Sequence, residues 1–92
     1  MRAARVDKLV LAGRTMWVTV LAFGPLADIL DGRSHKIEIP PNSSVRYLLE
    51  EMGIDEWIDR SISISINDTI VTDDHPLTDG DEIALLPPVS GG

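Results

Sequence analysis

The chain has no cysteine, and only 4% of its 92 residues are aromatic. The absence of thiols excludes a disulfide framework, a thiolate metal site and a cysteine nucleophile. No run approaches the roughly 20 apolar residues that span a bilayer, whereas a hydrophobic content of 43% is enough for one small core. These features predict a single domain in a reducing compartment, and therefore a cytoplasmic protein with no membrane segment.

Basic side chains are scarce beyond residue 15. The formal net charge is -7, and residues 1–15 hold four basic side chains and one acidic side chain, a charge of +3. Residues 16–92 therefore carry -10, from four basic and fourteen acidic side chains. Such a surface repels nucleic acid and favours a basic protein partner. The alternative is that the acidic side chains only keep a small protein soluble.

The basic segment 1–15 has the charge of a targeting peptide but not its hydrophobicity. A secretory signal needs an apolar core of about 7 to 15 residues, and this segment contains only a short apolar stretch, Val10-Leu11-Ala12. The first strand pattern begins at Trp17. We therefore expect residues 1–15 to be a flexible, dispensable leader and Met16 to be an alternative natural start.

Apolar periodicity predicts an α+β domain over residues 16–86. One helix over residues 44–52 is indicated by a buried stripe at i, i+3, i+4 and i+7, with Asn42, Ser43 or Ser44 as its cap and Gly53 at its end. The helix can cover one face of a four- or five-stranded sheet, and a crossover through it permits the first strand to lie beside the last. Two shorter helical turns are expected, at residues 26–31 and 54–59. The predicted strands are residues 17–23, 35–39, 61–66, 69–71 and 82–86, the first two forming an antiparallel hairpin.

The sequence shows no constellation for catalysis or metal binding. His35 and His75 are isolated from each other and from any ligand-spaced cluster. The acidic residues between positions 73 and 82 lack the ligand spacing of a calcium loop. We therefore expect no metal site and no active site in this chain, which leaves the carboxylate of Gly92 as its most distinctive chemical group.

The last residues, Pro87-Pro88-Val89-Ser90-Gly91-Gly92, have an unusual composition. The two prolines keep the backbone extended and cannot continue a strand ladder. The two glycines form a slim strip of backbone that a narrow channel in another protein can admit. Residues 87–92 are predicted to be a flexible, extended tail with a reach on the order of 20 Å. The alternative is an ordinary frayed terminus.

The ending from Asp74 to Gly92, which contains HPLTDGDEIALLPPVSGG, resembles that of molybdopterin synthase small subunits. Those proteins belong to the MoaD/ThiS-like sulfur carriers of the ubiquitin-like β-grasp superfamily. The similarity spans residues 17–92, with weaker support at 20–24 and 66–71, and the leader is a departure from it. The resemblance implies a β-grasp fold, in which one main helix covers a mixed sheet.

The resemblance implies that the chain carries sulfur and has no catalytic site of its own. An adenylating enzyme would use ATP to activate Gly92, next to the equally slim Gly91, and a sulfurtransferase would help convert it to a thiocarboxylate. The large synthase subunit would then pass the sulfur to a cyclic pterin precursor in molybdenum cofactor biosynthesis. The implied assembly is a heterotetramer, with no cofactor bound to this chain, no nucleic acid and no membrane partner.

The resemblance also implies a docking surface for the large subunit. Apolar family positions fall at Phe23, Ile70 and Leu86, which we expect to form an exposed patch. The patch would act together with the tail residues Pro87, Pro88, Val89 and Ser90. The alternative is that Phe23 and Ile70 are core residues.

Three other functions stay open at this point. The chain resembles thiamine sulfur carriers too, although the Pro-Pro-Val context favours the molybdopterin branch. A ubiquitin-like modifier, joined through Gly92 to lysines of target proteins, would have the same ending. An acidic interaction domain with an inert tail is the third alternative.

Overall fold

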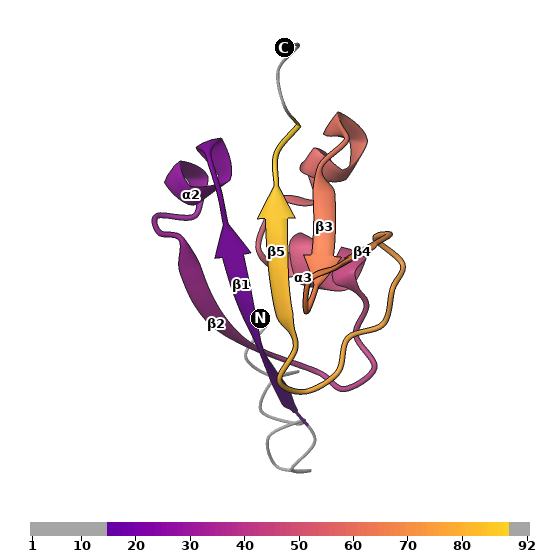
Figure 1. Cartoon of the computed structure of the whole chain (residues 1–92). Coiled ribbons are helices and arrows are strands. Elements are labelled where there is room, and N and C mark those ends of the chain that lie inside the picture. The colour runs from indigo at the N-terminus through magenta and orange to yellow at the C-terminus, as the bar shows by residue number, and fades with distance from the viewer. Residues whose placement is uncertain (1–14, 89–92) are drawn as a thin grey trace.

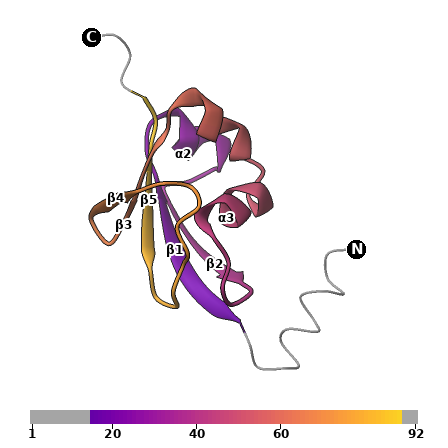
Figure 2. The same cartoon turned by 90° about the vertical axis from the view of Figure 1, so that its right-hand side faces the viewer.

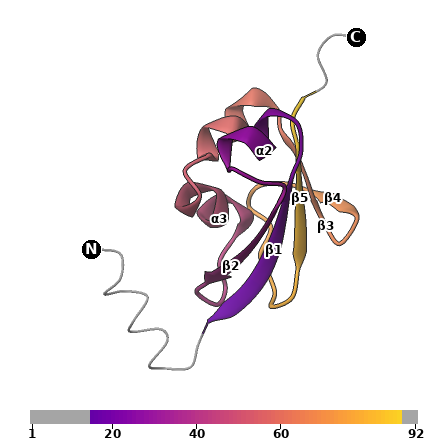
Figure 3. The same cartoon turned by 90° about the vertical axis from the view of Figure 1, so that its left-hand side faces the viewer.

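The computed structural model describes residues 15–88, so that most of the predicted leader and residues 89–92 lie outside the described part of the chain. One mixed sheet of five strands, in the order β2-β1-β5-β3-β4, forms one layer. The helices pack on one of its faces (Figures 1, 2 and 3). The elements are β1 (Met16–Ala22), α2 (Pro25–Ile29), β2 (Ser34–Ile39), α3 (Val45–Glu51), η1 (Asp55–Arg60), β3 (Ser63–Ile66), β4 (Thr69–Val71) and β5 (Glu82–Leu86).

The hydrophobic core lies between the sheet and the helices. Successive side chains of a strand point to opposite faces, and every second residue of β1, from Met16 to Ala22, is buried. From α3, the core receives the predicted stripe of Val45, Leu48 and Leu49, while Met52 packs at its edge. The described residues therefore have the predicted α+β layers, with α3 as the main covering helix.

The first and last strands lie side by side, as predicted. β1 pairs with β5 in parallel, from Thr19 opposite Glu82 to Ala22 opposite Leu85. β1 also forms the predicted antiparallel hairpin with β2. Because parallel strands end at the same edge of a sheet, β1 and β5 both reach their carboxyl ends at the end of the domain near α2 (Figure 1).

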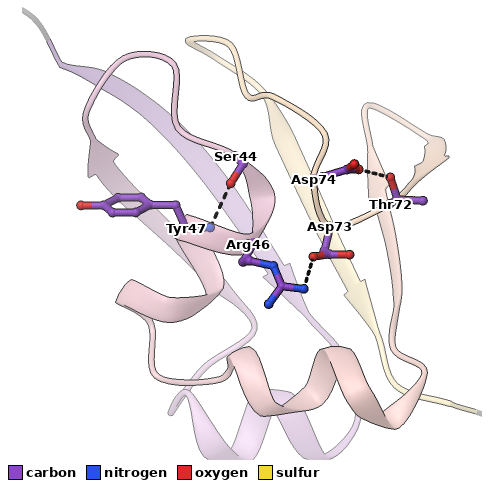
Figure 4. A network of polar contacts seen from close by, with 6 residues as sticks. All are labelled: Ser44, Arg46, Tyr47, Thr72, Asp73 and Asp74. Carbon is purple, nitrogen blue, oxygen red and sulfur yellow. Dashed lines mark hydrogen bonds and ion pairs between the residues drawn. The ribbon is translucent and has the colours of Figure 1, made fainter.

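The loop of residues 72–81 closes the amino-terminal end of α3 (Figure 4). The first N–H groups of a helix have no partner within the helix. In this chain the N–H of Val45 donates to the carbonyl of His75 (3.0 Å), and the N–H of Arg46 donates to the carbonyl of Asp73 (2.7 Å). The loop thus supplies acceptors that the helix itself lacks.

Side chains complete this junction (Figure 4). Ser44, one of the predicted caps, accepts a hydrogen bond from the N–H of Tyr47 through Oγ (3.2 Å). The Arg46 guanidinium forms an ion pair with the Asp73 carboxylate (2.6 Å). The Thr72 hydroxyl donates to the Asp74 carboxylate within the loop. Together these contacts attach the loop before β5 to the helix.

Four predicted strand boundaries are wrong. β1 and β2 each begin one residue earlier than predicted, at Met16 and Ser34. The first strand ends at Ala22 instead of Phe23, because the backbone turns toward α2 at Gly24, which has a φ of 59° and a ψ of -137°. The strand predicted over 61–66 begins only at Ser63. Ser61 ends η1 in a left-handed conformation with a φ of 63°, so the alternation of serine and isoleucine begins before the backbone becomes extended.

Candidate functional site

The face of the sheet opposite the helices is uncovered in the described part of the chain (Figures 2 and 3). The pairing register brings four residues into one row across it. Leu21 is opposite Ala84, Ala84 is opposite Ser65, and Ser65 is opposite Ile70. This row crosses β1, β5, β3 and β4, so residues far apart in the sequence form one continuous surface.

The three predicted patch residues lie at this uncovered face. Ile70 is 68% exposed and Leu86 is 37% exposed, whereas Phe23 is half-buried. The printed register ends with Ala22 opposite Leu85, and Phe23 and Leu86 are the residues that follow this pair in the sequence. Neither Phe23 nor Ile70 belongs to the core cluster, so the alternative that they are core residues is wrong. We call Leu21, Phe23, Ile70, Ala84 and Leu86 the open-face patch.

The four basic side chains of the described residues are all engaged. Arg33 lies over the ring of Phe23, with its guanidinium carbon 5.9 Å from the ring centroid. Lys36 and Arg60 lie over tryptophan rings, at 5.5 and 5.1 Å, and Arg46 pairs with Asp73. Fourteen acidic side chains outnumber these four basic ones in residues 15–88, and the net negative charge favours a partner with basic side chains around the contact.

The tail begins at Pro87, beside the open-face patch. Pro87 is half-buried and Pro88 is exposed, and a proline has no N–H with which to extend the ladder. A Cβ atom built on Gly24 would lie 3.2 Å from Cγ of Pro87. Nothing in the sequence alone shows that the residue after Phe23 contacts the residue after Leu86.

The remaining predicted site residues, Val89, Ser90, Gly91 and Gly92, lie outside the described residues. Within residues 15–88, no three His, Cys, Asp or Glu side chains are grouped as metal ligands would be. His35 bonds to the carbonyl of Gly32 (3.0 Å) and His75 to the carbonyl of Pro76 (2.7 Å). Both imidazoles thus have local backbone partners. In the same part of the chain, no helix is long and apolar enough to cross a membrane.

Comparisons with known proteins find relatives along most of the chain. The molybdopterin synthase sulfur carrier subunit of Escherichia coli is 33% identical over 81 residues, covering 82% of this chain and 99% of that protein. Subunit 1 in a complex of subunits 1 and 2 of the molybdopterin-converting factor of Helicobacter pylori is 35% identical. It covers 84% of this chain and 100% of that one, with a TM-score of 0.55.

The fold has a further counterpart among archaeal proteins. The small archaeal modifier protein 1 of Haloferax volcanii aligns with a TM-score of 0.69 over 80% of this chain and 99% of its own, at 21% identity. That similarity shows a shared ubiquitin-like β-grasp fold, as the sequence predicted. The ThiS family itself matches residues 20–92. The match covers both the open-face patch and the last residues, and the chain is therefore a member of the ThiS family.

Proposed function

We propose that the chain is a sulfur carrier and acts as the small subunit of a molybdopterin synthase. The observation that carries this proposal is its 33% identity over 99% of the E. coli sulfur carrier subunit of that synthase. Its 35% identity to a subunit in a two-subunit converting-factor complex supports a large-subunit partner. In this function the chain presents its end to active sites that belong to other proteins, in the cytoplasm.

The proposed chemistry begins with activation of Gly92. A carboxylate is ionised at neutral pH and can attack phosphorus. One of its oxygens attacks the α-phosphorus of ATP, the bond to the β-phosphate bridge breaks, and pyrophosphate leaves. A hydrosulfide-level sulfur nucleophile then attacks the acyl carbon, AMP leaves with the oxygen, and the chain ends in a thiocarboxylate.

Transfer of the sulfur would take place on the large subunit. The thiocarboxylate sulfur attacks a carbon of the cyclic pterin precursor, the bond from that carbon to its oxygen substituent breaks, and the oxygen leaves with the electron pair. The product is a thioester between chain and substrate. Water then attacks the acyl carbon, the bond from that carbon to sulfur breaks, and the Gly92 carboxylate is regenerated. Two such deliveries supply both sulfur atoms of a dithiolene.

The open-face patch supports docking on the large subunit in a heterotetramer. Exposed apolar side chains that form one contiguous surface are typical of interaction sites. The exposed Ile70 and Leu86 lie at its borders, and the small Ala84 lies between them. Pro87 and Pro88 follow directly from β5, so the tail leaves from the edge of the docking surface.

Intact-mass spectrometry tests the proposal directly. The full chain is incubated with ATP, the activating enzyme of its own organism and hydrosulfide as the sulfur nucleophile. We expect the mass increase of one oxygen replaced by sulfur, only when ATP is present and only in a chain that ends at Gly92. A matched variant ending at Ser90 should stay unmodified. An unchanged mass of the full chain would contradict the proposal.

The same materials separate the alternative functions. A thiocarboxylated chain that passes sulfur to thiazole synthesis, and not to a cyclic pterin with the large subunit, would place it in the thiamine branch. The structural similarity to an archaeal modifier protein keeps a modifier role testable as the second candidate. Isopeptide-linked ladders that disappear in the variant ending at Ser90 would support that role.

A further inference from the structure

We propose that Gly24 is a positioning residue for the tail, because the turn that contains it lies against Pro87. This inference depends on the proposed function, since it concerns how the chain delivers Gly92 to a partner. We call this contact, between Gly24 in the turn that follows β1 and Pro87, the first residue after β5, the seat. It would fix the direction in which the tail leaves the domain.

The space at Gly24 is just sufficient for this contact. A Cβ atom at that position would lie 3.2 Å from Cγ of Pro87, so a side chain there would push the proline ring outward. The backbone of Gly24 has a φ of 59° and a ψ of -137°, a combination that essentially only glycine adopts. Both the missing side chain and the backbone conformation thus allow the turn to approach the tail.

The turn that contains Gly24 is held in place by contacts on both sides of that residue. Leu26, two residues after Gly24, is fully buried in the core. The N–H of Ala27 donates to the carbonyl of Gly24 (3.0 Å), and the N–H of Ala22 donates to the carbonyl of Arg33 (2.8 Å). The turn is therefore fixed to the core and to the residue that precedes β2, while Pro87 is half-buried between exposed neighbours, Leu86 and Pro88.

The position of Pro87 matters because it lies at the start of the tail. From Pro87 to Gly92 an extended chain reaches on the order of 20 Å, and Pro88 limits bending at its first step. A shift of the proline ring therefore moves the far end by a larger distance. Misplacement of a reacting group by about 1 Å can lower a rate up to 100-fold.

The chain offers a matched control for backbone strain. Gly53 also has a positive φ, of +76°, but a Cβ atom there would meet nothing within 4 Å. Gly53→Ala should lower the melting temperature by about 4 to 8 °C, and Gly24→Ala by at least as much, because its backbone conformation is the less accessible to alanine. Only Gly24→Ala should also displace Pro87, so the two variants separate a loss of stability from a loss of tail position.

The test measures the rate of sulfur transfer from the thiocarboxylated chain to the cyclic pterin precursor on the large subunit. We expect Gly24→Ala to lower kcat about tenfold and to change KM for the carrier by less than about threefold. Gly53→Ala should leave both constants within about twofold of the wild type. If Gly24→Ala and Gly53→Ala have the same kcat, the inference is wrong.

A second variant approaches the contact from the other side and does not strain the turn. Pro87→Ala removes the ring and should lower kcat about as much as Gly24→Ala. If both act through one contact, the double variant loses no more than either single variant, whereas independent effects would multiply. Losses that multiply would show that Gly24 and Pro87 do not act through one contact, and the inference would be wrong even if Gly24→Ala folds poorly. A wild-type chain that accepts no sulfur would contradict the proposed function first, and this inference with it.

Discussion

Leu85 and Leu86 are neighbours in β5, yet Leu85 is fully buried and Leu86 is 37% exposed. The same contrast runs along β1, where Val20 is fully buried and Trp17 is 44% exposed. Side chains alternate along both strands, so every second residue faces the helices and the residues between them face the open side of the sheet. The covered face supplies the apolar burial that stabilises the fold, and the open face keeps large apolar side chains in contact with solvent.

This difference separates folding from recognition within one sheet. Apolar area that is already buried in the free chain contributes to the free energy of unfolding. Apolar area that remains exposed contributes only when a partner removes it from water. Adjacent residues of the same type can therefore have opposite roles, and substitutions at the two faces should have separable effects.

The largest expected effect is on the stability of the covered face. Leu85→Ala should lower the free energy of unfolding by about 2 to 5 kcal/mol, because it leaves a cavity beneath α3 and the neighbouring strands. Leu86→Ala should lower it by less than about 1 kcal/mol. Urea denaturation of both variants measures the difference. Equal losses would mean that the two faces do not differ as described.

The second prediction concerns binding at the open face. Ile70→Ser should weaken binding to the large synthase subunit about tenfold, or about 1.4 kcal/mol, because Ile70 is 68% exposed in the free chain. Its free energy of unfolding should change by no more than about 0.5 kcal/mol. Phe23→Ser should weaken binding in the same direction. Titration calorimetry with the purified large subunit measures both.

A control for that prediction lies on the other side of the molecule. Ile29 is 54% exposed but belongs to α2, on the covered side of the sheet. Ile29→Ser should leave the affinity for the large subunit unchanged. If Ile29→Ser weakens binding as much as Ile70→Ser, the interface is not confined to the open face, and exposure alone explains the effect.

Local patterns in the sequence were sufficient to predict most of the fold. The alternation in β1 and the stripe on α3 depend on neighbouring residues, and both signal their own burial. Gly53 has a φ of +76°, as a residue that ends a helix in the left-handed region does. The resemblance of the last residues to sulfur carriers then indicated which positions of the sheet would be exposed.

Contacts between distant parts of the chain were not predictable in the same way. Gly24 meets Pro87 only because β1 and β5 pair in parallel, and no local pattern encodes that register. Likewise, the carbonyls of Asp73 and His75 reach the first turn of α3 through the path of a loop. Ser61 was misassigned because the alternation of side chains continues into a residue whose φ of 63° is incompatible with a strand.

The third prediction concerns the contribution of a polar contact, the N-cap of α3, to the free energy of unfolding. Ser44→Ala removes the oxygen that accepts from the N–H of Tyr47 at 3.2 Å. The free energy of unfolding should fall by about 1 kcal/mol, as is usual for the loss of a helix N-cap. Ser63→Ala, at an exposed serine of β3, is the matched control and should change it by less than about 0.5 kcal/mol. Similar losses in both variants would show that the cap is not what holds the start of α3.

The smallest expected effect is that of the ion pair between Arg46 and Asp73. Although its atoms are 2.6 Å apart, the two side chains are 52% and 26% exposed, and solvent and salt weaken such pairs. A double-mutant cycle with Arg46→Ala and Asp73→Ala should give a coupling energy of about 0.5 kcal/mol or less, which decreases further in high salt. The backbone hydrogen bond from Arg46 to Asp73 (2.7 Å) remains in every variant, so the loop should stay attached to α3. A coupling well above 1 kcal/mol that persists in high salt would mean that this charge pair, together with apolar burial, determines how firmly the helix covers the sheet.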